Sequence, residues 1–308
     1  MQKHKILSNF LSISDISSKQ LSQILELSKK FKENKISSYY KNKVLGLIFD
    51  KSSTRTRVSF QVAMSRLGGT TIDLNPSTTQ IGRGESIKDT ARVLSRYCDV
   101  LAIRTFKHKD LEDYAKWSTK PVINALTDLE HPCQAIADFL TIKEEFGSLE
   151  DLILTYVGDG NNVANSLMLI AALMGVKIRI ACPKGYEPNQ SLIEKAIKIN
   201  GNDKFLTISN DPYSAALGAN VLYTDVWASM GEENKKEEKE KDFKDFSINK
   251  DLVSRAHQKV IILHCLPAYK GKEITEEVFE SDKSRIFDQA ENRLHVQQAL
   301  LANIFSEN

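Results

Sequence analysis

The sequence predicts an α/β protein of two domains, each a mostly parallel sheet covered by helices on both faces. Short apolar segments alternate with helical segments along nearly the whole chain, which is typical of parallel sheets with crossover helices. The length of 308 residues suits two domains better than one. We expect the first domain over residues 1–132 and the second over 133–291, with a final helix, 292–308, that packs back on the first.

The first half of the chain predicts four strands joined by helices. Strands are expected at 44–49, 70–74, 100–103 and 121–126, and the first of them is a short apolar run. A helix that buries Leu21, Ile24, Leu25 and Ser28 precedes them, with Ser14 and Asp15 as its candidate caps. Further helices are expected after Arg57, from a capping box at Ser86 and Asp89, after the third strand, and from Pro132 to Gly147.

The second half continues the alternation. Strands are expected at 152–157, 176–181, 205–208, 221–223 and 260–263, with an edge strand at 285–287. Helices separate them, one of them over 162–175, and a closing helix follows Asn292.

Composition excludes several classes of protein. The chain is 41% hydrophobic and 27% charged, as in ordinary globular proteins. With 42 basic and 40 acidic residues, it gives no reason to expect a nucleic-acid or membrane partner. Residues 1–7 lack the pattern of a secretory signal, and we expect a cytoplasmic protein. The four cysteines form no C-x-x-C pair, which argues against a zinc site or a disulfide framework.

The stretch from Lys51 to Arg57 has the chemistry of an anion site. It is the turn from a strand into a helix, and it carries three cations and four hydroxyls. Cations are unfavourable at this positive end of the helix dipole unless an anion joins them, and phosphate is the natural ligand. The alternatives are a basic, solvated helix start or a patch that touches nucleic acid.

Polar residues also follow most of the other predicted strands. Ligands of parallel sheets bind at the carboxyl ends of the strands. Cations dominate there in the first half, whereas amides and a carboxylate, Asp225, dominate in the second. This asymmetry predicts an anionic ligand on the first domain and an amine-bearing ligand on the second.

Four motifs resemble the signatures of the ornithine carbamoyltransferases. They are Ser53-Thr54-Arg55-Thr56-Arg57, His131-Pro132-x-Gln134, Asp225-x-x-x-Ser229-Met230-Gly231 and His264-Cys265-Leu266-Pro267. Their order and spacing follow the family over essentially the whole chain, as far as Glu291-Asn292-Arg293. The first two motifs are shared with aspartate carbamoyltransferase, whereas the last two resemble motifs of the ornithine enzyme.

The resemblance implies transfer of the carbamoyl group of carbamoyl phosphate to L-ornithine, giving L-citrulline and phosphate in arginine biosynthesis or the reverse in arginine catabolism. It implies no cofactor, no metal, and a homotrimer whose sites are shared between subunits. The implied carbamoyl phosphate residues are Ser53, Thr54, Arg55, Thr56, Gln80 (from a neighbouring subunit), Arg104, His131, Gln134, Cys265, Leu266 and Arg293. The implied ornithine residues are Asn162, Asp225, Ser229 and Met230, and the implied catalytic residues are Arg55, Arg104, His131 and Cys265.

The chemistry of the reaction agrees with this assignment. Negative charge develops on the carbonyl oxygen and on the leaving phosphate, so the site needs fixed hydrogen-bond donors at both groups. Arg104, His131 and Thr56 can serve the oxygen. The attacking amine must be neutral although its ordinary pKa is about 10.4, and a cationic, desolvated site lowers that pKa. No metal and no covalent intermediate are needed.

Three other functions stay open at this point. One is carbamoyl transfer to another amine such as putrescine, which would leave Asp225 and Asn162 without obvious partners. Another is a non-catalytic protein that binds a phosphorylated metabolite. The weakest is an NAD oxidoreductase, because Gly158-x-Gly160 lacks the third glycine, and the next strand ends in Cys182-Pro183 and not in an acid.

The charged run 232–245 predicts a solvated segment. Because it follows Ser229-Met230-Gly231, we also expect a lid over residues 227–245 that moves when ornithine binds. Trp227 and Met230 are expected at the surface, facing the site.

Overall fold

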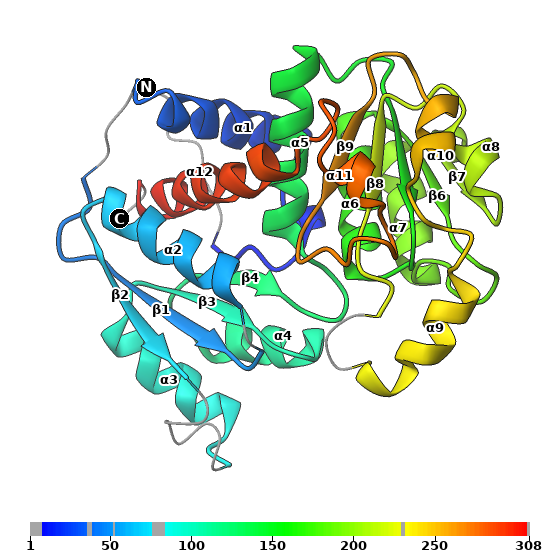
Figure 1. The fold of residues 1–308 in the computed structure, drawn as a ribbon. Coiled ribbons are helices and arrows are strands. Elements are labelled where there is room, and N and C mark those ends of the chain that lie inside the picture. The colour runs from blue at the N-terminus through cyan, green and yellow to red at the C-terminus, as the bar shows by residue number, and fades with distance from the viewer. Residues whose placement is uncertain (1–7, 36–38, 52, 76–83, 229–231, 307–308) are drawn as a thin grey trace. The chain divides into compact units, whose positions relative to one another are not determined.

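The computed structural model describes residues 8–35, 39–51, 53–75, 84–228 and 232–306. The chain divides into two compact units (Figure 1). Unit 1 comprises residues 1–137 and 291–308, and unit 2 comprises residues 138–290. Both divisions fall inside helices, α5 (Pro132–Phe146) and α12 (Ile286–Phe305). The domain limits expected from the sequence, 1–132 and 133–291, stay a prediction.

Unit 1 contains a four-stranded sheet in the order β2-β1-β3-β4, with every pair parallel. The strands are β1 (Val44–Phe49), β2 (Thr70–Leu74), β3 (Val100–Arg104) and β4 (Val122–Leu126). Its other helices are α1 (Ser18–Lys32), α2 (Thr54–Arg66), α3 (Ile87–Tyr97) and α4 (His108–Trp117). In Figure 1, α3 and α4 lie on one face of the sheet, and α1, α2 and α12 lie on the other.

Apolar side chains fix α3 and α4 against the sheet. Ile48, Leu101 and Ile103 of the strands are buried in one cluster with Ala91 of α3 and Leu111 of α4. Each large side chain removed from water in this way contributes roughly 1.5–3 kcal/mol. The packing holds the carboxyl ends of the strands in register, with Phe49 of β1 opposite Arg104 of β3.

Unit 2 contains a five-stranded parallel sheet in the order β7-β6-β5-β8-β9. The strands are β5 (Ile153–Val157), β6 (Lys177–Ala181), β7 (Leu206–Ser209), β8 (Val221–Thr224) and β9 (Ile261–His264). The helices are α6 (Asn162–Met174), α7 (Gln190–Asn200), α8 (Pro212–Ala216), α9 (Lys236–Asp242), α10 (Lys250–Arg255) and α11 (Glu276–Phe279). The predicted fold class, parallel sheets covered by helices, is confirmed.

The edge strand expected at residues 285–287 is wrong. Ser284 forms only an isolated bridge with Ile262, and Ile286 begins α12. The closing helix therefore starts well before Asn292. Its buried face runs through Ile286, Gln289, Asn292 and Val296, and the two buried amides on that face interrupted the apolar pattern that would have revealed a helix.

The expected caps of the first helix are also wrong. Ser17 caps α1: its hydroxyl accepts the Gln20 amide at 3.3 Å, and the Gln20 side chain accepts the Ser17 amide at 2.9 Å. Asp15 instead belongs to the short turn Ile13–Asp15, which Ser12 caps. The cap expected at Ser86 is confirmed, because its hydroxyl accepts the Asp89 amide at 3.1 Å.

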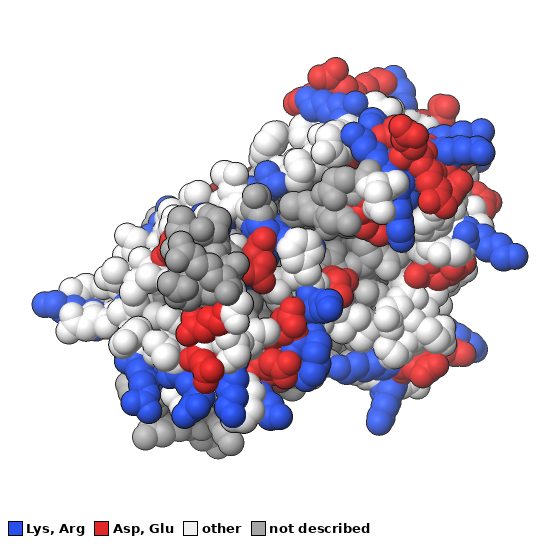
Figure 2. Space-filling model, turned by 90° about the horizontal axis from the view of Figure 1, so that it is seen from below, with Lys and Arg blue, Asp and Glu red and all other residues white. Residues whose placement is uncertain are grey.

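The surface carries both signs of charge. On the face shown in Figure 2, Lys and Arg side chains are interspersed with Asp and Glu side chains. Because the two signs are mixed, this face has no wide area of purely positive or purely negative electrostatic potential. Within the described part of the chain, no helix combines the length and the apolar character needed to cross a membrane.

Candidate active site

The start of α2 forms the anion-binding element of unit 1. Ser53 is its N-cap, and its hydroxyl accepts the Thr56 amide at 3.2 Å. Amides in a first helical turn lack intrahelical acceptors and lie at the positive end of the dipole. Thr54 and Arg55 are exposed there, whereas Thr56 is buried. This turn can therefore hold a phosphate through backbone amides, hydroxyls and the Arg55 guanidinium.

Arg293 joins three elements of unit 1 into one polar cluster. Arg293 is 4% exposed, and its guanidinium donates to Gln134 Oε1 of α5 at 2.5 Å and to Thr56 Oγ1 of α2 at 3.2 Å. It also lies 3.5 Å from His131 Nε2. Because guanidinium groups only donate, Nε2 is the acceptor and the His131 ring carries its proton on Nδ1.

The imidazole of His131 is uncharged in this cluster. Burial lowers the pKa of its imidazole well below the ordinary 6.5, and the charges of Arg293, Arg104 and Arg55 lower it further. Arg104, the last residue of β3, is itself buried. A neutral imidazole among cations can donate its Nδ1 proton to a carbonyl oxygen without adding a further charge.

Acid should therefore destabilise the protein through His131. Below pH ~6.5 the unfolded chain binds a proton at this residue that the folded chain does not, so the free energy of unfolding falls as pH falls. The loss is up to about 1.4 kcal/mol per pH unit until the folded pKa is reached. Urea unfolding at pH 7.5 and 5.5 checks this: His131→Asn should show a smaller difference between the two pH values than the unchanged protein. Equal differences would contradict the prediction.

Asp225 is the centre of the polar cluster in unit 2. It follows β8 and is 6% exposed. Its Oδ2 accepts the Asn161 side-chain amide at 2.9 Å, and its Oδ1 accepts the Cys265 thiol at 3.0 Å. Asn161 also caps α6, because its Oδ1 accepts the amides of Val163 and Ala164. The start of α6 and the end of β9 thus hold this carboxylate from two sides.

Cys265 acts as a donor in this arrangement. Burial raises the pKa of its thiol well above the ordinary 9.0, and the Asp225 carboxylate raises it further. The sulfur therefore keeps its proton at neutral pH and donates it to Asp225. A thiolate nucleophile at this position is not favoured.

A buried pair fixes the backbone after Cys265. His264 Nδ1 accepts the Leu266 amide at 2.8 Å, so the ring proton is on Nε2, which lies 3.0 Å from Glu273 Oε1. The His264 amide donates to the Gln289 side chain at 2.9 Å. Leu266 is held at a φ of +60°, a conformation that is uncommon for residues other than glycine. The predicted His-Cys-Leu-Pro motif is thus a rigid turn.

Asp225, His264 and Cys265 offer ligand atoms within 4.8 Å of one another. Three such groups can bind a transition metal. Here both ring nitrogens of His264 already have partners, Leu266 and Glu273. We therefore do not assign a metal to this cluster.

Three residues of these clusters were missed by the sequence reasoning. Asn161 holds Asp225, and the ornithine role expected of its neighbour Asn162 stays a prediction. Glu273 and Gln289 support the turn at His264 from 9 and 25 residues away. The N-cap preference for Asn at the start of α6 was a usable signal for Asn161. For the other two residues no local signal exists.

Some of the predicted site residues fall outside the described part of the chain, namely Gln80, Ser229 and Met230. Trp227 was expected at the surface, and this was wrong. It is 7% exposed and stacks on Phe243 at 6.0 Å between ring centroids. The run 232–245 is also packed more than expected, because it forms α9 and buries Lys239 and Phe243. That the segment moves when ornithine binds stays a prediction.

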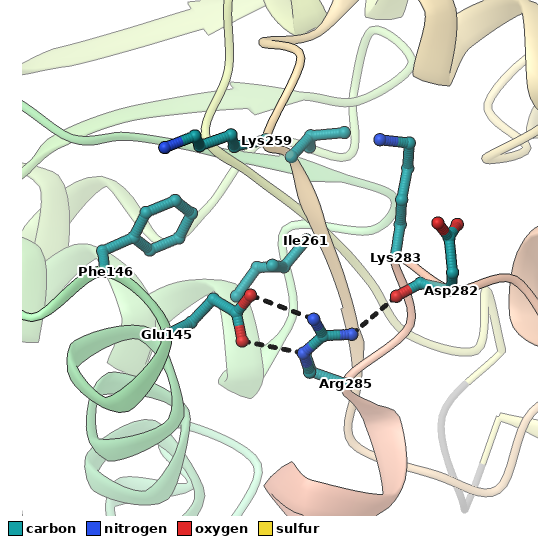
Figure 3. A pocket seen from close by; sticks show the side chains of 8 residues that line it. Glu145, Phe146, Lys259, Ile261, Asp282, Lys283 and Arg285 are labelled. Carbon is teal, nitrogen blue, oxygen red and sulfur yellow. Dashed lines mark hydrogen bonds and ion pairs between the residues drawn. The ribbon is translucent and has the colours of Figure 1, made fainter.

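A separate surface pocket of unit 2 lies at the beginning of β9, away from the site residues that follow its end. Its volume is about 320 Å³, and Figure 3 shows Arg285 paired with Glu145 on its wall. The Arg285 Nε to Glu145 Oε2 distance is 2.8 Å. No predicted site residue lines this pocket.

Comparison with known proteins identifies the class. The carbamoyl-P binding domain of aspartate/ornithine carbamoyltransferase matches residues 8–144, and its Asp/Orn binding domain matches residues 150–304. The chain belongs to the aspartate/ornithine carbamoyltransferase family, so the predicted resemblance is confirmed.

Relatives within the family carry the ornithine name. The chain is 72% identical to the ornithine carbamoyltransferase of Prochlorococcus marinus subsp. pastoris over 294 residues, 96% of each protein. The solved ornithine carbamoyltransferase from Pyrococcus furiosus matches it with a TM-score of 0.92 at 46% identity, over 97% of both chains. The anabolic enzyme from Campylobacter jejuni matches with a TM-score of 0.91 at 38% identity, over 98% of this chain and all of the other.

Proposed function

We propose that this protein is an ornithine carbamoyltransferase, which transfers the carbamoyl group of carbamoyl phosphate to the δ-amine of L-ornithine. The observation that supports ornithine as the amino-acid substrate is the buried carboxylate of Asp225, which Asn161 and Cys265 hold in place. A carboxylate in that position attracts the α-ammonium group of ornithine. It would disfavour aspartate, whose additional side-chain carboxylate repels it.

The residues of unit 1 suit the other substrate. The first turn of α2, with Ser53, Thr54 and Arg55, would bind the phosphate. His131 and Arg104 would donate to the carbamoyl oxygen, on which negative charge grows as the amine attacks. The new C–N bond forms as the C–O bond to phosphate breaks, and the amine proton is lost to solvent or to the departing phosphate.

An amine-specificity assay tests the proposal. The protein is supplied with carbamoyl phosphate and, separately, ornithine, putrescine, N-acetylornithine or aspartate, and the carbamoylated product is measured. We expect citrulline from ornithine at a kcat/KM at least about a hundredfold above the others, because a site built for polar groups rejects amines that lack them. Preferential carbamoylation of putrescine would make the alternative transferase correct.

Asp225→Asn should weaken ornithine binding by roughly 1.5–3 kcal/mol, because a charge-assisted hydrogen bond is lost. Binding of carbamoyl phosphate should hardly change. Calorimetric titration of the variant with carbamoyl phosphate, and then with norvaline as an unreactive analogue of ornithine, separates the two effects. Equal weakening of both ligands would refute the assignment of Asp225.

We also propose a homotrimer in the cytoplasm, as the family resemblance implies. Exposed apolar side chains of unit 1 support an interface between subunits, among them Val58, Ile72, Val93 and Tyr97, which are 42–69% exposed. Sedimentation equilibrium should give about three times the mass of one chain, 34.7 kDa. A monomer at micromolar concentration would contradict the trimer and also the predicted role of Gln80 from a neighbouring subunit.

A further inference from the structure

Lys239 is a buried cation in an otherwise exposed charged helix. It is 3% exposed, and its ammonium contacts two carboxylates, Asp159 Oδ2 at 2.7 Å and Glu232 Oε2 at 2.6 Å. Its neighbours Lys236 and Lys241 on α9 are exposed. Burying an ammonium is costly unless it is paired, so the burial of Lys239 depends on these two carboxylates.

The two carboxylates belong to different parts of the proposed ornithine site. Asp159 lies two residues before Asn161, which holds Asp225, and the Asn161 amide donates to the Asp159 carbonyl at 2.7 Å. Glu232 directly follows the Ser229-Met230-Gly231 motif in the sequence. One ammonium therefore joins the loop that orients Asp225 to the segment that follows Gly231.

The surrounding contacts make this connection stiff. Tyr186 donates its hydroxyl to Asp242 of α9 at 2.8 Å, and the Gly160 amide donates to the Tyr186 carbonyl at 2.9 Å. Phe243, directly after α9, is fully buried in the core of unit 2. A shift of α9 would therefore also shift the loop 158–161.

The charges show why Lys239 is needed. Burial raises the pKa of Asp159, Lys239 lowers it, and the charges of Glu232 and Asp225 raise it. Without the ammonium, three carboxylates would repel one another. Asp159 would then either take up a proton or move, and Asn161 would follow.

We infer that Lys239 is a positioning residue for ornithine: through Asp159 and Asn161 it sets the place of the Asp225 carboxylate, and through Glu232 it holds the segment after Gly231. The inference rests on the proposed function for its kinetic consequence. Its structural part, the coupling of α9 to the loop 158–161, can be measured without any substrate.

Lys239→Met and its matched control Lys241→Met test the inference. Lys239→Met should raise the ornithine KM about tenfold or more, since small displacements of positioning groups have effects of this size. The carbamoyl phosphate KM should change less than twofold. Lys239→Arg should recover most of the loss, and Lys241→Met should behave as the unchanged protein. Equal changes in both KM values, or a loss in the control of the same size, would overturn the inference.

A double-mutant cycle with Asp159→Asn gives a second readout. If the two residues act as one pair, the double variant should be no worse than the poorer single variant. Additive losses would overturn the pairing.

Hydrogen exchange of the ligand-free protein gives the third readout. The Gly160 amide should exchange at least about tenfold faster in Lys239→Met than in Lys241→Met, because its acceptor on Tyr186 is no longer held. Equal exchange in the two variants would overturn the inference. If the unchanged protein made no citrulline, the proposed function would fail, while the exchange result would still decide the coupling.

Discussion

Gly160→Ala should disable the ornithine site and destabilise unit 2. A Cβ atom at Gly160 would lie 2.3 Å from the Pro188 nitrogen and 2.5 Å from the Tyr186 carbonyl oxygen. These are backbone atoms that no side-chain rotation can move away, so one of the two loops must shift. We expect a loss of about 3 kcal/mol in unfolding free energy. The ornithine KM should rise at least about tenfold, because the shift displaces the adjacent Asn161.

Gly201→Ala is the control for this prediction. Gly201 has a φ of +76° and open space around its Cβ position, so the substitution costs only the left-handed conformation, about 1–2 kcal/mol. It should leave the ornithine KM unchanged. Thermal unfolding and initial rates measure both variants. Normal ornithine kinetics in Gly160→Ala would show that the loop tolerates the displacement and would refute the argument.

Arg293→Met should cost about 3–5 kcal/mol in kcat/KM for carbamoyl phosphate, which is roughly a hundredfold to a few thousandfold. The substitution removes a buried charge and leaves Gln134 and Thr56 without the donor that orients them. It should also raise the pKa of His131, because Arg293 is the largest of the charges that lower it. The acid limb of the rate profile should therefore move to higher pH.

Two further variants complete the test: Arg293→Lys separates the effect of the charge from that of the hydrogen-bond geometry, and Arg285→Met is the control. Arg293→Lys keeps the charge but not the fork geometry, so it should keep the acid limb near its original pH while losing part of the rate. Arg285→Met removes a guanidinium from the partly exposed pair with Glu145 and should cost about 1 kcal/mol or less in stability, with normal rates. Unchanged kinetics in Arg293→Met would remove this residue from the site.

Features written in consecutive residues were predictable from the sequence. The helix start at Ser53 and nine of the ten expected strands follow local patterns of apolar and capping residues, and the structure has them where expected. The early start of α12 was missed because Gln289 and Asn292 face the interior, where they hold other parts of the fold. A pattern of apolar residues cannot reveal a buried amide whose partner lies elsewhere in the chain.

The supports of the site were less predictable than its motifs. Lys239 looked like one more solvated charge in a run of Lys and Glu. Only the fold brings Asp159, 80 residues earlier, within 2.7 Å of its ammonium. The spacing of Lys239 and Phe243, four residues apart, was the one local indication that this helix has a buried face. Trp227 was misjudged for the same reason, because its stacking partner is Phe243.

The division of the chain has a consequence for its biosynthesis. Unit 2 is a single continuous stretch, residues 138–290, whereas unit 1 combines residues 1–137 with residues 291–308. During translation, domains fold as their residues leave the ribosome. The four strands of unit 1 are complete by residue 126. The cluster of Thr56, His131 and Gln134 receives Arg293 only when nearly the whole chain has emerged. A nascent chain released after residue 290 would contain every residue of unit 2 but would lack Arg293, the cation that joins Thr56 and Gln134 in unit 1.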